Sequence, residues 1–559
     1  MQDRADPGGR RPVGGIGNRL GTARRHVLKI GVINTGGTIS CVGNPLAPMT
    51  STQFKAACQS HLDPILKQKF TDLVLDYVTD LAFPESDSGM LDSTNLQPSD
   101  WCLIARHILE RYDTVDGWIV LHGTDTMDYS GTALAMLLAR FSADGTVLAQ
   151  LNKPVILTGS QVPLFHSPTP GVISGMTFNS DAFQNVCGAV AAAQTGLAGV
   201  SVFFDSQLMR GSRVVKADAS QFRGFSSPNF PVIGQYGITL GLNADLAPLP
   251  PVSSAVSLDD EAARAETLAQ LQAITSSINK APVITLGAFP AWYDAAQGKA
   301  LLADMIRACV AQGIGGLVLQ AYGAGNFPSG NARQPDQGAI YKALDEANRA
   351  GVVVVDNTQV LQGAVDYNTY AAGAWLPAIG ALNPVDMTVM ASLAKLTVLL
   401  AARGANGWSL DDVKYLMQIP LVGEMADISR LDSRSNAVLL PGQLLSTLNG
   451  SASLVNDPVH GPQLRDSSGK TLWSMLGSML NENEKTALPG RLQMRDDGNL
   501  VFYNRNNQPL WQSKTGGEQG ASSQLRLSQP DENTVCLSVY DYHRRQPLWS
   551  ENFLLTSDQ

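Results

Sequence analysis

Two short segments place threonines directly after apolar runs. Val32–Ser40 reads VINTGGTIS, so Thr35 follows a strand-like run and precedes two glycines. Trp118–Met127 reads WIVLHGTDTM, which delivers Thr124 and Asp125 in the same way. Threonine is a weak nucleophile at its ordinary pKa, so it needs a base and backbone N–H groups that hold a developing oxyanion. Both segments are compatible with hydroxyl-based chemistry.

Glycine pairs after strands can also hold phosphates. The sequence around Gly36 and Gly37 contains neither GxGxxG nor GxxxxGK[ST], and no lysine follows to reach a phosphate. In an open α/β sheet, ligands bind beyond the carboxyl ends of the strands. We therefore expect Thr35, Thr124 and Asp125 to lie at one sheet edge. For either segment alone, a tight turn with a capping threonine is the structural alternative.

A base for the threonines has one candidate. Lys216 lies in GSRVVKAD, in a polar turn region after the strand-like run 198–204. The pKa of a lysine falls readily when its side chain is desolvated, and the neutral amine can then act as a base. A solvated surface lysine is the alternative for this residue.

The elements that must position these residues alternate between strand and helix. Strand-like runs cover 28–33, 116–121, 154–158, 198–204 and 232–241, and helical patterns cover 98–111, 129–140 and 180–194. A Pro- and Ser-rich stretch at 244–262 reads as a linker. Beyond it, strands at 283–289, 317–322 and 352–356 alternate with helices at 298–311, 336–349 and 386–403. This alternation predicts an α/β fold in two lobes, with largely parallel sheets covered by helices.

A repeat replaces this pattern after about residue 430, where Gly, Asn, Asp and Ser punctuate short runs. A Leu-Trp pair ends three similar segments, at Trp473, Trp511 and Trp549, with 38 residues from 473 to 511 and again from 511 to 549. Equal spacing indicates an internal repeat. We expect three small β units that share one aromatic core, since one unit could not bury its apolar face alone.

Composition limits the size class and the partners. The chain has 559 residues, of which 44% are hydrophobic and 16% charged, as in a globular protein of two to four domains. The net charge of -9 argues against nucleic acid as a main partner. The six cysteines lie far apart and the histidines show no HExxH spacing. We expect reduced thiols, no metal and no cofactor.

The N-terminal residues 1–26 carry six arginines and several glycines without an apolar core of the signal-peptide kind. They read as a flexible tail. The later apolar runs are shorter than the about 20 residues that cross a membrane. We therefore expect no membrane span and a cytoplasmic location.

Two motifs together justify a family comparison. NTGGTIS and LHGTDTM closely resemble the signature segments of the bacterial-type L-asparaginases, the asparaginase/glutaminase family. Further segments match in order, namely DSTNLQPSDW, TGSQVP, the Lys216 region, AYGAGN and DMTVMASLAKL. The resemblance covers about residues 28–425. It implies the two-lobe asparaginase fold, with an N-terminal domain at 27–243 and a C-terminal domain at 263–427.

The resemblance implies an amidohydrolase that acts on linear amides and converts L-asparagine to L-aspartate and ammonia. Thr35 would be the nucleophile that attacks the amide carbon. Thr124, Asp125 and Lys216 would form the second catalytic group. No cofactor takes part in the implied reaction.

The resemblance also implies how the substrate is held. Ser93 and Asp125 would bind its α-carboxylate and α-amino group, with Thr94 beside them. Asn326 would reach in from the second lobe of a neighbouring subunit. Because the family builds its site between subunits, we expect a homo-oligomer, either a dimer or a tetramer.

The chain departs from the family at two places. The family usually carries a tyrosine on the mobile loop after the first motif, whereas no tyrosine occurs here between Gly36 and Asp76. Met390 stands where the family tends to have a glutamate. These departures leave an alternative function, a weak or inactive asparaginase-fold protein that targets carbohydrate.

The remaining residues, 428–559, resemble the bulb-type (monocot mannose-binding) lectins, a β-prism of three sheets. The lectin motif Gln-x-Asp-x-Asn-x-Val-x-Tyr is matched in part by the middle repeat, with Arg in place of Gln, and by the last repeat, with Leu in place of Tyr. Each polar set would occupy alternate positions of a strand and share one face. The candidate residues for a mannose-type glycan are Asp497, Asn499, Tyr503, Gln529, Asp531 and Asn533. A structural or assembly role is the alternative.

Overall fold

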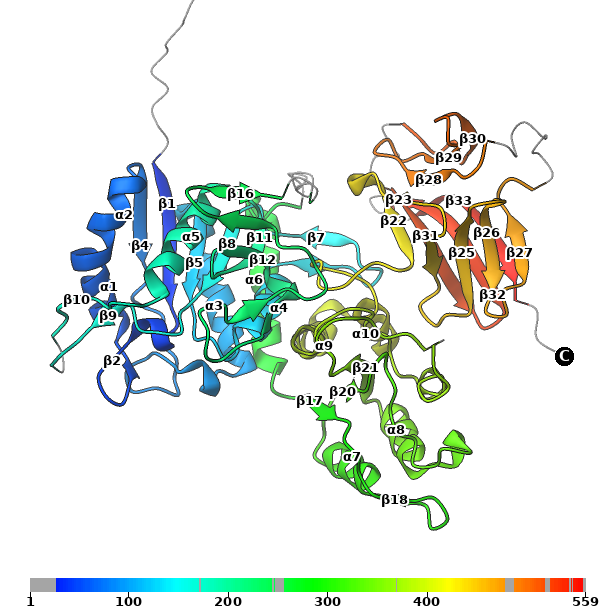
Figure 1. Cartoon of the computed structure of the whole chain (residues 1–559), viewed down its shortest axis with the longest axis horizontal. Helices are drawn as coiled ribbons and strands as arrows, with labels where there is room; N and C mark the ends of the chain where they lie inside the picture. The colour runs from blue at the N-terminus through cyan, green and yellow to red at the C-terminus, as the bar shows by residue number, and fades with distance from the viewer. Residues whose placement is uncertain are drawn as a thin grey trace, which may run out of the picture.

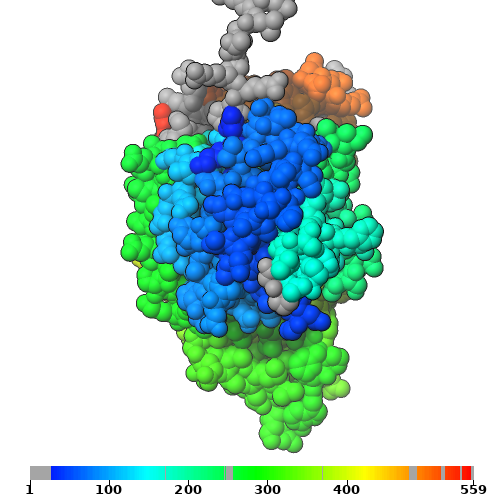
Figure 2. All heavy atoms as spheres, turned by 90° about the vertical axis from the view of Figure 1, so that its left-hand side faces the viewer, coloured from blue at the N-terminus to red at the C-terminus, as the bar shows by residue number. Residues whose placement is uncertain are grey.

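The computed structural model describes residues 27–169, 172–243, 246, 256–367, 369–477, 487–517, 523–541, 544 and 546–555. The tail predicted at 1–26 and much of the linker predicted at 244–262 lie outside these residues. Figure 1 shows a large sheet with its helices, a smaller lobe below it, and an all-β region at the right. Figure 2 views the N-terminal strands and helices face on, with the smaller lobe in green beneath them.

The large sheet has eight strands in the order β16-β15-β12-β11-β8-β5-β1-β4. The strands are β1 (Leu28–Asn34), β4 (Leu73–Tyr77), β5 (Gly117–Leu121), β8 (Pro154–Thr158), β11 (Gly199–Phe204), β12 (Gln207–Arg210), β15 (Gly234–Tyr236) and β16 (Leu240–Leu242). Neighbours from β4 to β11 are parallel, and β12, β15 and β16 are antiparallel. The α/β class is confirmed, but the sheet is mixed.

Local backbone conformation explains the antiparallel part. Asp205 and Ser206 have φ values of 45° and 64°, which reverse the chain between β11 and β12 in a two-residue turn. The strand predicted at 232–241 is a hairpin, in which Tyr236 pairs with Leu240. A pattern of apolar residues does not distinguish one long strand from two short ones joined by a turn.

Helices cover both faces of the large sheet. On one face lie α3 (Pro98–Glu110) and α4 (Met127–Leu137), and on the other lie α1 (Ser51–Ala57), α2 (Asp63–Lys69) and α5 (Ala182–Gln194). Alternate strand residues enter the two cores, as where Val120 joins one cluster and Ile119 the other. A strand buried on both faces reads as a continuous apolar run, which is why β5 and β8 were predictable.

The smaller lobe has a parallel sheet of β17 (Val283–Gly287), β20 (Gly316–Ala321) and β21 (Val353–Thr358). Its helices are α7 (Leu301–Ala311), α8 (Ala339–Arg349), α9 (Val389–Asn406) and α10 (Leu410–Met417), and the preceding helix α6 (Glu261–Ser277) packs against both α3 and α9. Helix α6 begins inside the predicted linker, where the Asp260 side chain accepts the Ala263 N–H. The sequence analysis did not predict α1, α2, α6 or α10.

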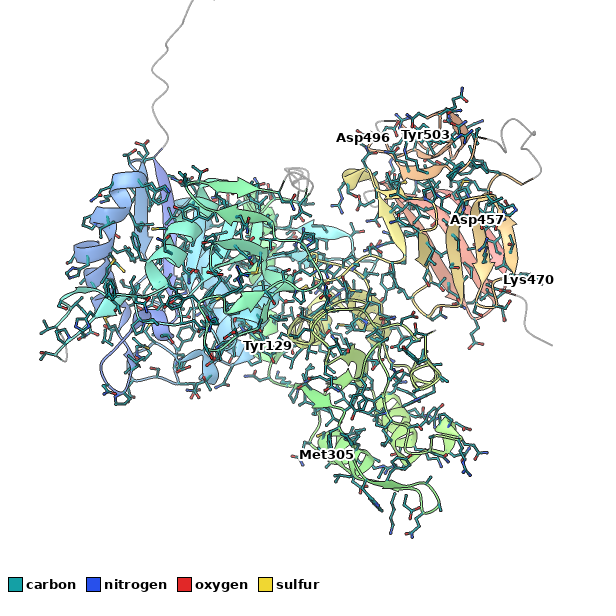
Figure 3. The ribbon with its side chains drawn as sticks, in the orientation of Figure 1. Tyr129, Met305, Asp457, Lys470, Asp496 and Tyr503 are labelled. Carbon is teal, nitrogen blue, oxygen red and sulfur yellow. The ribbon has the colours of Figure 1, made fainter. Side chains whose placement is uncertain are left out.

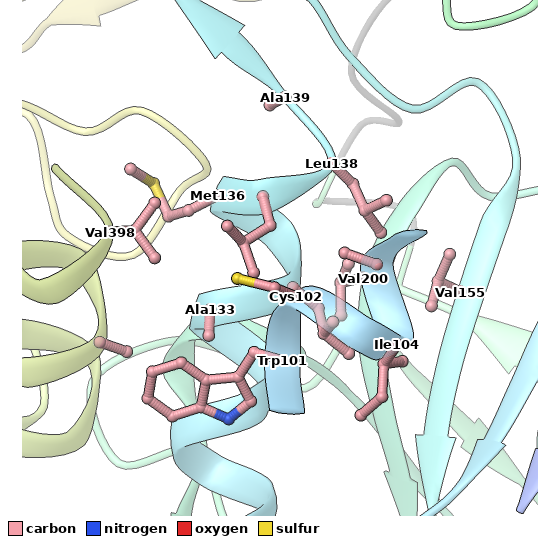
Figure 4. Packing of buried hydrophobic residues seen from close by; sticks show 14 of the residues in the cluster. Trp101, Cys102, Ile104, Ala133, Met136, Leu138, Ala139, Val155, Val200 and Val398 are labelled. Carbon is pink, nitrogen blue, oxygen red and sulfur yellow. The ribbon is translucent and has the colours of Figure 1, made fainter. Parts of the chain in front are cut away.

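The two sheets share one continuous core. Trp101 and Cys102 on α3 and Met136 on α4 belong to the same buried cluster as Val398 on α9 (Figure 4). Helix α9 also packs against β17, β20 and β21. The second lobe is therefore attached to the large sheet by buried apolar packing.

A buried ion pair holds the end of this α/β part. The Lys395 ammonium on α9 contacts the Glu424 carboxylate at 2.6 Å, and both side chains are fully buried. Lys395 also donates to the carbonyls of Met417 and Ile419. The N–H of Val422 donates to Glu424. These bonds satisfy two buried charges and fix the 417–425 loop on α9.

Five two-stranded hairpins decorate the α/β part. They are β2 (Cys41–Val42) with β3 (Ala47–Pro48), β6 (Arg140–Phe141) with β7 (Val147–Ala149), β9 (Phe165–His166) with β10 (Gly175–Met176), β13 (Val215–Lys216) with β14 (Phe225–Ser226), and β18 (Tyr293–Asp294) with β19 (Lys299–Ala300). The hairpin β2–β3 occupies the place of the loop that follows the first threonine motif. All six cysteines are free.

The C-terminal region contains three four-stranded antiparallel sheets around one hydrophobic cluster. The first is β22 (Arg430–Asp432), β31 (Ser523–Asp531), β32 (Thr534–Asp541) and β33 (Gln546–Leu554). The second is β23 (Val438–Leu439), β28 (Arg491–Met494), β29 (Leu500–Tyr503) and β30 (Pro509–Gln512). The third is β24 (Leu444–Ser446), β25 (Ala452–Asp457), β26 (Gly461–Asp466) and β27 (Thr471–Ser474).

The repeated tryptophans lie on the last strand of each sheet and meet at the shared core. The rings of Trp511 and Trp549 are 5.5 Å apart, and Trp473 is 5.6 Å from Phe553. Segment 430–446 contributes one strand to each of the three sheets, a sheet exchange that the repeat spacing did not reveal. None of the helices in the described ranges is long and apolar enough to cross a membrane.

Candidate active site

Thr35 follows β1 at the carboxyl edge of the large sheet. Its N–H and its hydroxyl both donate to the Leu121 carbonyl, at 2.9 and 3.1 Å. Its own carbonyl accepts the Leu91 N–H. The side chain is 3% exposed. The hydroxyl is therefore held where β1 and β5 end together.

Glycines let three chain segments meet at this edge. A Cβ on Gly37, which has φ 73°, would lie 2.3 Å from the Cα of Gly123. A Cβ on Gly36, with φ 110°, would lie 2.0 Å from the Leu91 carbonyl oxygen. A Cβ on Gly123 would lie 2.4 Å from the Ser93 hydroxyl. Any larger residue would push the two threonine turns and the Ser93 segment apart.

Lys216 connects the second threonine to the carboxylate beside it. Its ammonium donates to the Thr124 hydroxyl at 2.8 Å and to the Asp125 carboxylate. The hydrogen bond from Lys216 lowers the pKa of Asp125 below its usual value. Thr124 therefore accepts a hydrogen bond from a cation and keeps its own proton for donation.

Ser93 and Thr94 complete the same cluster. The Thr94 hydroxyl donates to the second oxygen of Asp125 at 3.0 Å. The Ser93 hydroxyl accepts the Asp125 N–H at 3.2 Å, so its own proton remains for another acceptor. The structure thus brings together Thr94, Ser93, Thr124, Asp125 and Lys216 through direct bonds, and it joins Thr35 to them through the glycine turns.

Asp128 contacts this cluster through the backbone of Lys216, and it was not among the predicted site residues. Its carboxylate accepts the backbone N–H of Lys216 at 3.0 Å from the first turn of α4. The side chain is 3% exposed, and burial raises the pKa of Asp128 to about 6. Its place three residues after Asp125 was the only signal, and first-turn acidic residues are common as helix caps.

Asn326 stays apart from these residues within one chain. It lies after β20 in the smaller lobe, where its N–H donates to the Tyr322 carbonyl and its carbonyl accepts the Tyr322 N–H. Met390, half-buried, is near the start of α9 in the same lobe. In the described part of the chain, the recorded hydrogen bonds of Asn326 remain within its own lobe.

The comparison with known proteins decides the family. Residues 29–247 match the family described as "Asparaginase, N-terminal", and residues 299–415 match "Glutaminase/Asparaginase C-terminal domain". L-asparaginase 1 of Escherichia coli K12 is 33% identical over 314 residues, which are 56% of this chain and 76% of that protein. The chain belongs to the asparaginase family of amidohydrolases.

Solved structures agree with this membership. The L-asparaginase of Thermococcus kodakarensis has a TM-score of 0.52 at 25% identity, and L-asparaginase I of Vibrio cholerae has 0.51 at 28%. Both likenesses cover 71% of this chain and 99% of the other. The human 60 kDa lysophospholipase is also similar, at 30% identity over 74% of this chain and 61% of that protein. The asparaginase-type α/β fold is thus established.

Asp497 and Asn499 lie in the turn before β29, whereas Tyr503 is in β29 and Gln529 and Asp531 are in β31. Asp497 pairs with Arg495 at 2.9 Å and accepts the Asn499 N–H. The Asn499 side chain bonds Ser513 and Gln512 and is 8% exposed. Both precede β29, so the expected alternation along one strand is wrong for them, because the chain reverses at this point.

The polar residues of the last repeat are also hydrogen-bonded within the protein. The side-chain oxygen of Gln529 accepts hydrogen bonds from the Asn449 amide and the Ser451 hydroxyl, both at 2.6 Å. Asp531 closes β31 and accepts the N–H of Asn533 in the turn before β32. Many of the polar atoms proposed for sugar binding are therefore bonded within the protein.

The buried carboxyl of Asp128 predicts a pH effect on stability. Its folded pKa of about 6 lies above the ordinary 3.8. Between these values the unfolded chain releases the proton and the folded protein keeps it, so stability falls as pH rises. Asp128→Asn should therefore gain stability over the wild type from pH 4 to pH 6, by up to about 3 kcal/mol. Denaturant unfolding at a series of pH values measures the difference.

Asp218→Asn is the matched control with the opposite sign. Hydrogen bonds from the Ser220 and Gln221 N–H groups lower the pKa of Asp218. Its contribution is present above its unfolded pKa and is lost as pH falls, so this variant loses stability against the wild type at neutral pH. A wild-type-to-Asp128→Asn difference that stays constant from pH 4 to pH 7 would contradict the assignment.

Proposed function

We propose that the chain hydrolyses L-asparagine to L-aspartate and ammonia with Thr35 as the nucleophile. The observation that carries the proposal is the bonded group of Thr124, Asp125 and Lys216 beside the Thr35 turn. The Thr35 oxygen would attack the amide carbon, the C–N bond would break, and the departing nitrogen would take the proton that Thr35 gives up. Water would then cleave the ester that joins the acyl group to Thr35.

The bonds of the cluster support a role in holding the substrate. Asp125 has a lowered pKa and stays ionised at neutral pH, so it can bind an α-ammonium group. The Ser93 hydroxyl has its proton available for an α-carboxylate, because its oxygen already accepts the Asp125 N–H. Thr94 fixes the second oxygen of Asp125.

The Thr35 assignment predicts the loss of amide hydrolysis. Thr35→Ala should lower kcat for asparagine by roughly 10³-fold or more, because it removes the attacking oxygen. Ammonia release from asparagine and from glutamine is the measurement. Thr35→Ser keeps a hydroxyl and should retain measurable activity.

Thr132→Ala provides the matched control for this test. Thr132 is a buried threonine on α4 whose hydroxyl has no partner among the described residues. Its removal should leave ammonia release within about threefold of the wild type, since it lies outside the bonded cluster. A wild type as inactive as Thr35→Ala would exclude hydrolysis and favour the carbohydrate-targeting alternative.

We also propose that a second copy of the chain completes the site with Asn326. The lobe that carries Asn326 exposes several large apolar side chains, namely those of Phe289, Trp292, Tyr293, Leu301, Met305 and Tyr322. Trp292 is 63% exposed, and Met305 lies on the outer side of α7 (Figure 3). Tyr322, one of these exposed side chains, exchanges backbone hydrogen bonds with Asn326 and so lies beside the proposed contact. Exposed apolar groups of this kind mark protein interfaces.

Mixing two inactive variants tests the shared site. In a hetero-oligomer of Thr35→Ala and Asn326→Ala, one site combines Thr35 with the partner's intact Asn326. Random pairing into dimers should restore about a quarter of wild-type ammonia release. Full activity of Asn326→Ala alone, or a mixture no better than its components, would contradict the proposal.

The C-terminal residues 428–559 have a second candidate function. We propose that they form a bulb-lectin-like β-prism that binds mannose-type glycans, following asparaginase domains at 27–243 and 263–427. The support is the set of three four-stranded sheets around one core. Tyr503 lies on the uppermost sheet in Figure 3 and is half-buried; its hydroxyl accepts a hydrogen bond from Arg495 at 3.4 Å, so its own proton is left for a ligand.

A glycan array with the full chain tests this candidate. Mannose-type binding should fall by roughly tenfold in Tyr503→Phe or in Asn533→Ala, the loss expected for one hydrogen bond. Asp466→Asn, in the first repeat, should bind as the wild type does. Binding no higher than background in the wild type would leave the structural role.

A further inference from the structure

A cavity of about 380 Å³ lies between the asparaginase part and the C-terminal region. Helix α10 and the residue just after it contribute Tyr415 and Gln418, and β31 with its turn contributes Arg526, Gln529 and Asp531. Its size falls in the range of small-molecule sites. The cavity is distant in sequence from Thr35, and it lies outside the matched asparaginase segments except for Tyr415.

Two arginines face each other across a strand pair at this cavity. Strand β22 pairs with β31 in antiparallel register, with Arg430 directly opposite Arg526. Like charges in this position repel each other, so such a pair destabilises a sheet unless an anion compensates. Arg430 is compensated within the protein, since it is 8% exposed and its Nε donates to Asp427 at 2.6 Å.

Arg526 is held in place, and no carboxylate among the described residues forms a direct ion pair with it. Its Nε donates to the Gln524 side chain at 3.2 Å, and its guanidinium lies 3.8 Å from the centre of the Tyr540 ring. Burial is the main cause that lowers the pKa of Arg526, and the charge of Arg430 acts in the same direction, whereas Tyr415, Asp144 and Tyr540 act against it. In the described part of the chain, its two terminal nitrogens have no hydrogen-bond partner. The side chain is therefore pre-oriented with two donors left for a ligand.

The acidic residues of the cavity lie at its other end. Asp531 and Glu532 are five and six residues beyond Arg526, near the end of β31. At about 3.3 Å per residue along a strand, the backbone of Asp531 is at most roughly 17 Å from that of Arg526, and the register irregularity between Ser528 and Asp531 lies in this stretch. Asp531 is also engaged by the Asn533 N–H. At the arginine end, Arg430 is paired with Asp427, and Arg526 is the lining cation that keeps donors for a ligand.

We propose that this cavity binds a small organic or inorganic oxyanion, which accepts hydrogen bonds from the Arg526 guanidinium. Carboxylate and phosphate both present two oxygens at the spacing that a guanidinium binds bidentately. Tyr415 and Gln418 supply further polar groups from the asparaginase part. Bound anion would thus bridge α10 and β31. The site is independent of the proposed amide hydrolysis.

Titration calorimetry on the full chain tests the proposal with two probes, inorganic phosphate and malonate, which separate tetrahedral from planar oxyanions. We expect saturable binding of at least one of them and weaker binding at high salt, because the contact is electrostatic. Arg526→Gln should weaken it by roughly 10- to 100-fold, the loss of hydrogen bonds to a charged group. Arg526→Lys keeps the charge without the bidentate geometry and should weaken binding less.

Arg491→Gln is the matched control. Arg491 lies over the Tyr503 ring at 4.6 Å in the neighbouring sheet, so it repeats the arginine-tyrosine stack away from the cavity. Its replacement should leave anion binding unchanged. Binding that Arg526→Gln does not alter, no binding of either anion, or equal affinity for neutral D-mannose would overturn the proposal. Should Arg526→Gln fail to fold, an unchanged affinity in Arg526→Lys would overturn it equally.

Discussion

The site depends on the contact between two glycine turns. Gly37 and Gly123 approach so closely that no side chain fits between them, and Gly123 in turn lies against Ser93. This contact unites the ends of β1 and β5 with the segment that carries Ser93 and Thr94. The threonines and the carboxylate can form one cluster only because the backbones touch there.

Charged side chains with defined partners hold the segment that carries Lys216 in place. The Asp128 carboxylate accepts the backbone N–H of Lys216 and so fixes β13. The Lys216 ammonium on this strand then donates to the Thr124 hydroxyl. Three residues before Lys216, Arg213 donates to the Gly423 carbonyl and pairs with Asp386. The 417–425 loop therefore links the segment that carries Lys216 to α9, where Lys395 and Glu424 are buried together. Such pairs are positioned by packing, and loss of either partner leaves a buried charge.

The C-terminal region is also held together by contacts between segments that are distant in the sequence. Each of its sheets takes one strand from 430–446, so the region closes on itself around a common core. The first of these strands places Arg430 opposite Arg526 at the boundary with α10. In the α/β part, Lys395 is paired with Glu424, whereas here Arg526 lines a cavity and forms no ion pair among the described residues. That contrast distinguishes a structural charge cluster from a prospective binding site.

By itself, the sequence determined the α/β class, most strands of the two α/β sheets, six of the helices, and the residues with reactive groups at the strand ends. These are local properties, set by hydrophobic period and turn chemistry. Tertiary structure alone decided that Lys216 bonds Thr124 and Asp125, which are 92 and 91 residues away, and that Asp128 lies below them. It also decided the antiparallel strands and the pairing of Arg430 with Arg526. Contacts over such separations depend on strand order and register, which a local pattern does not contain.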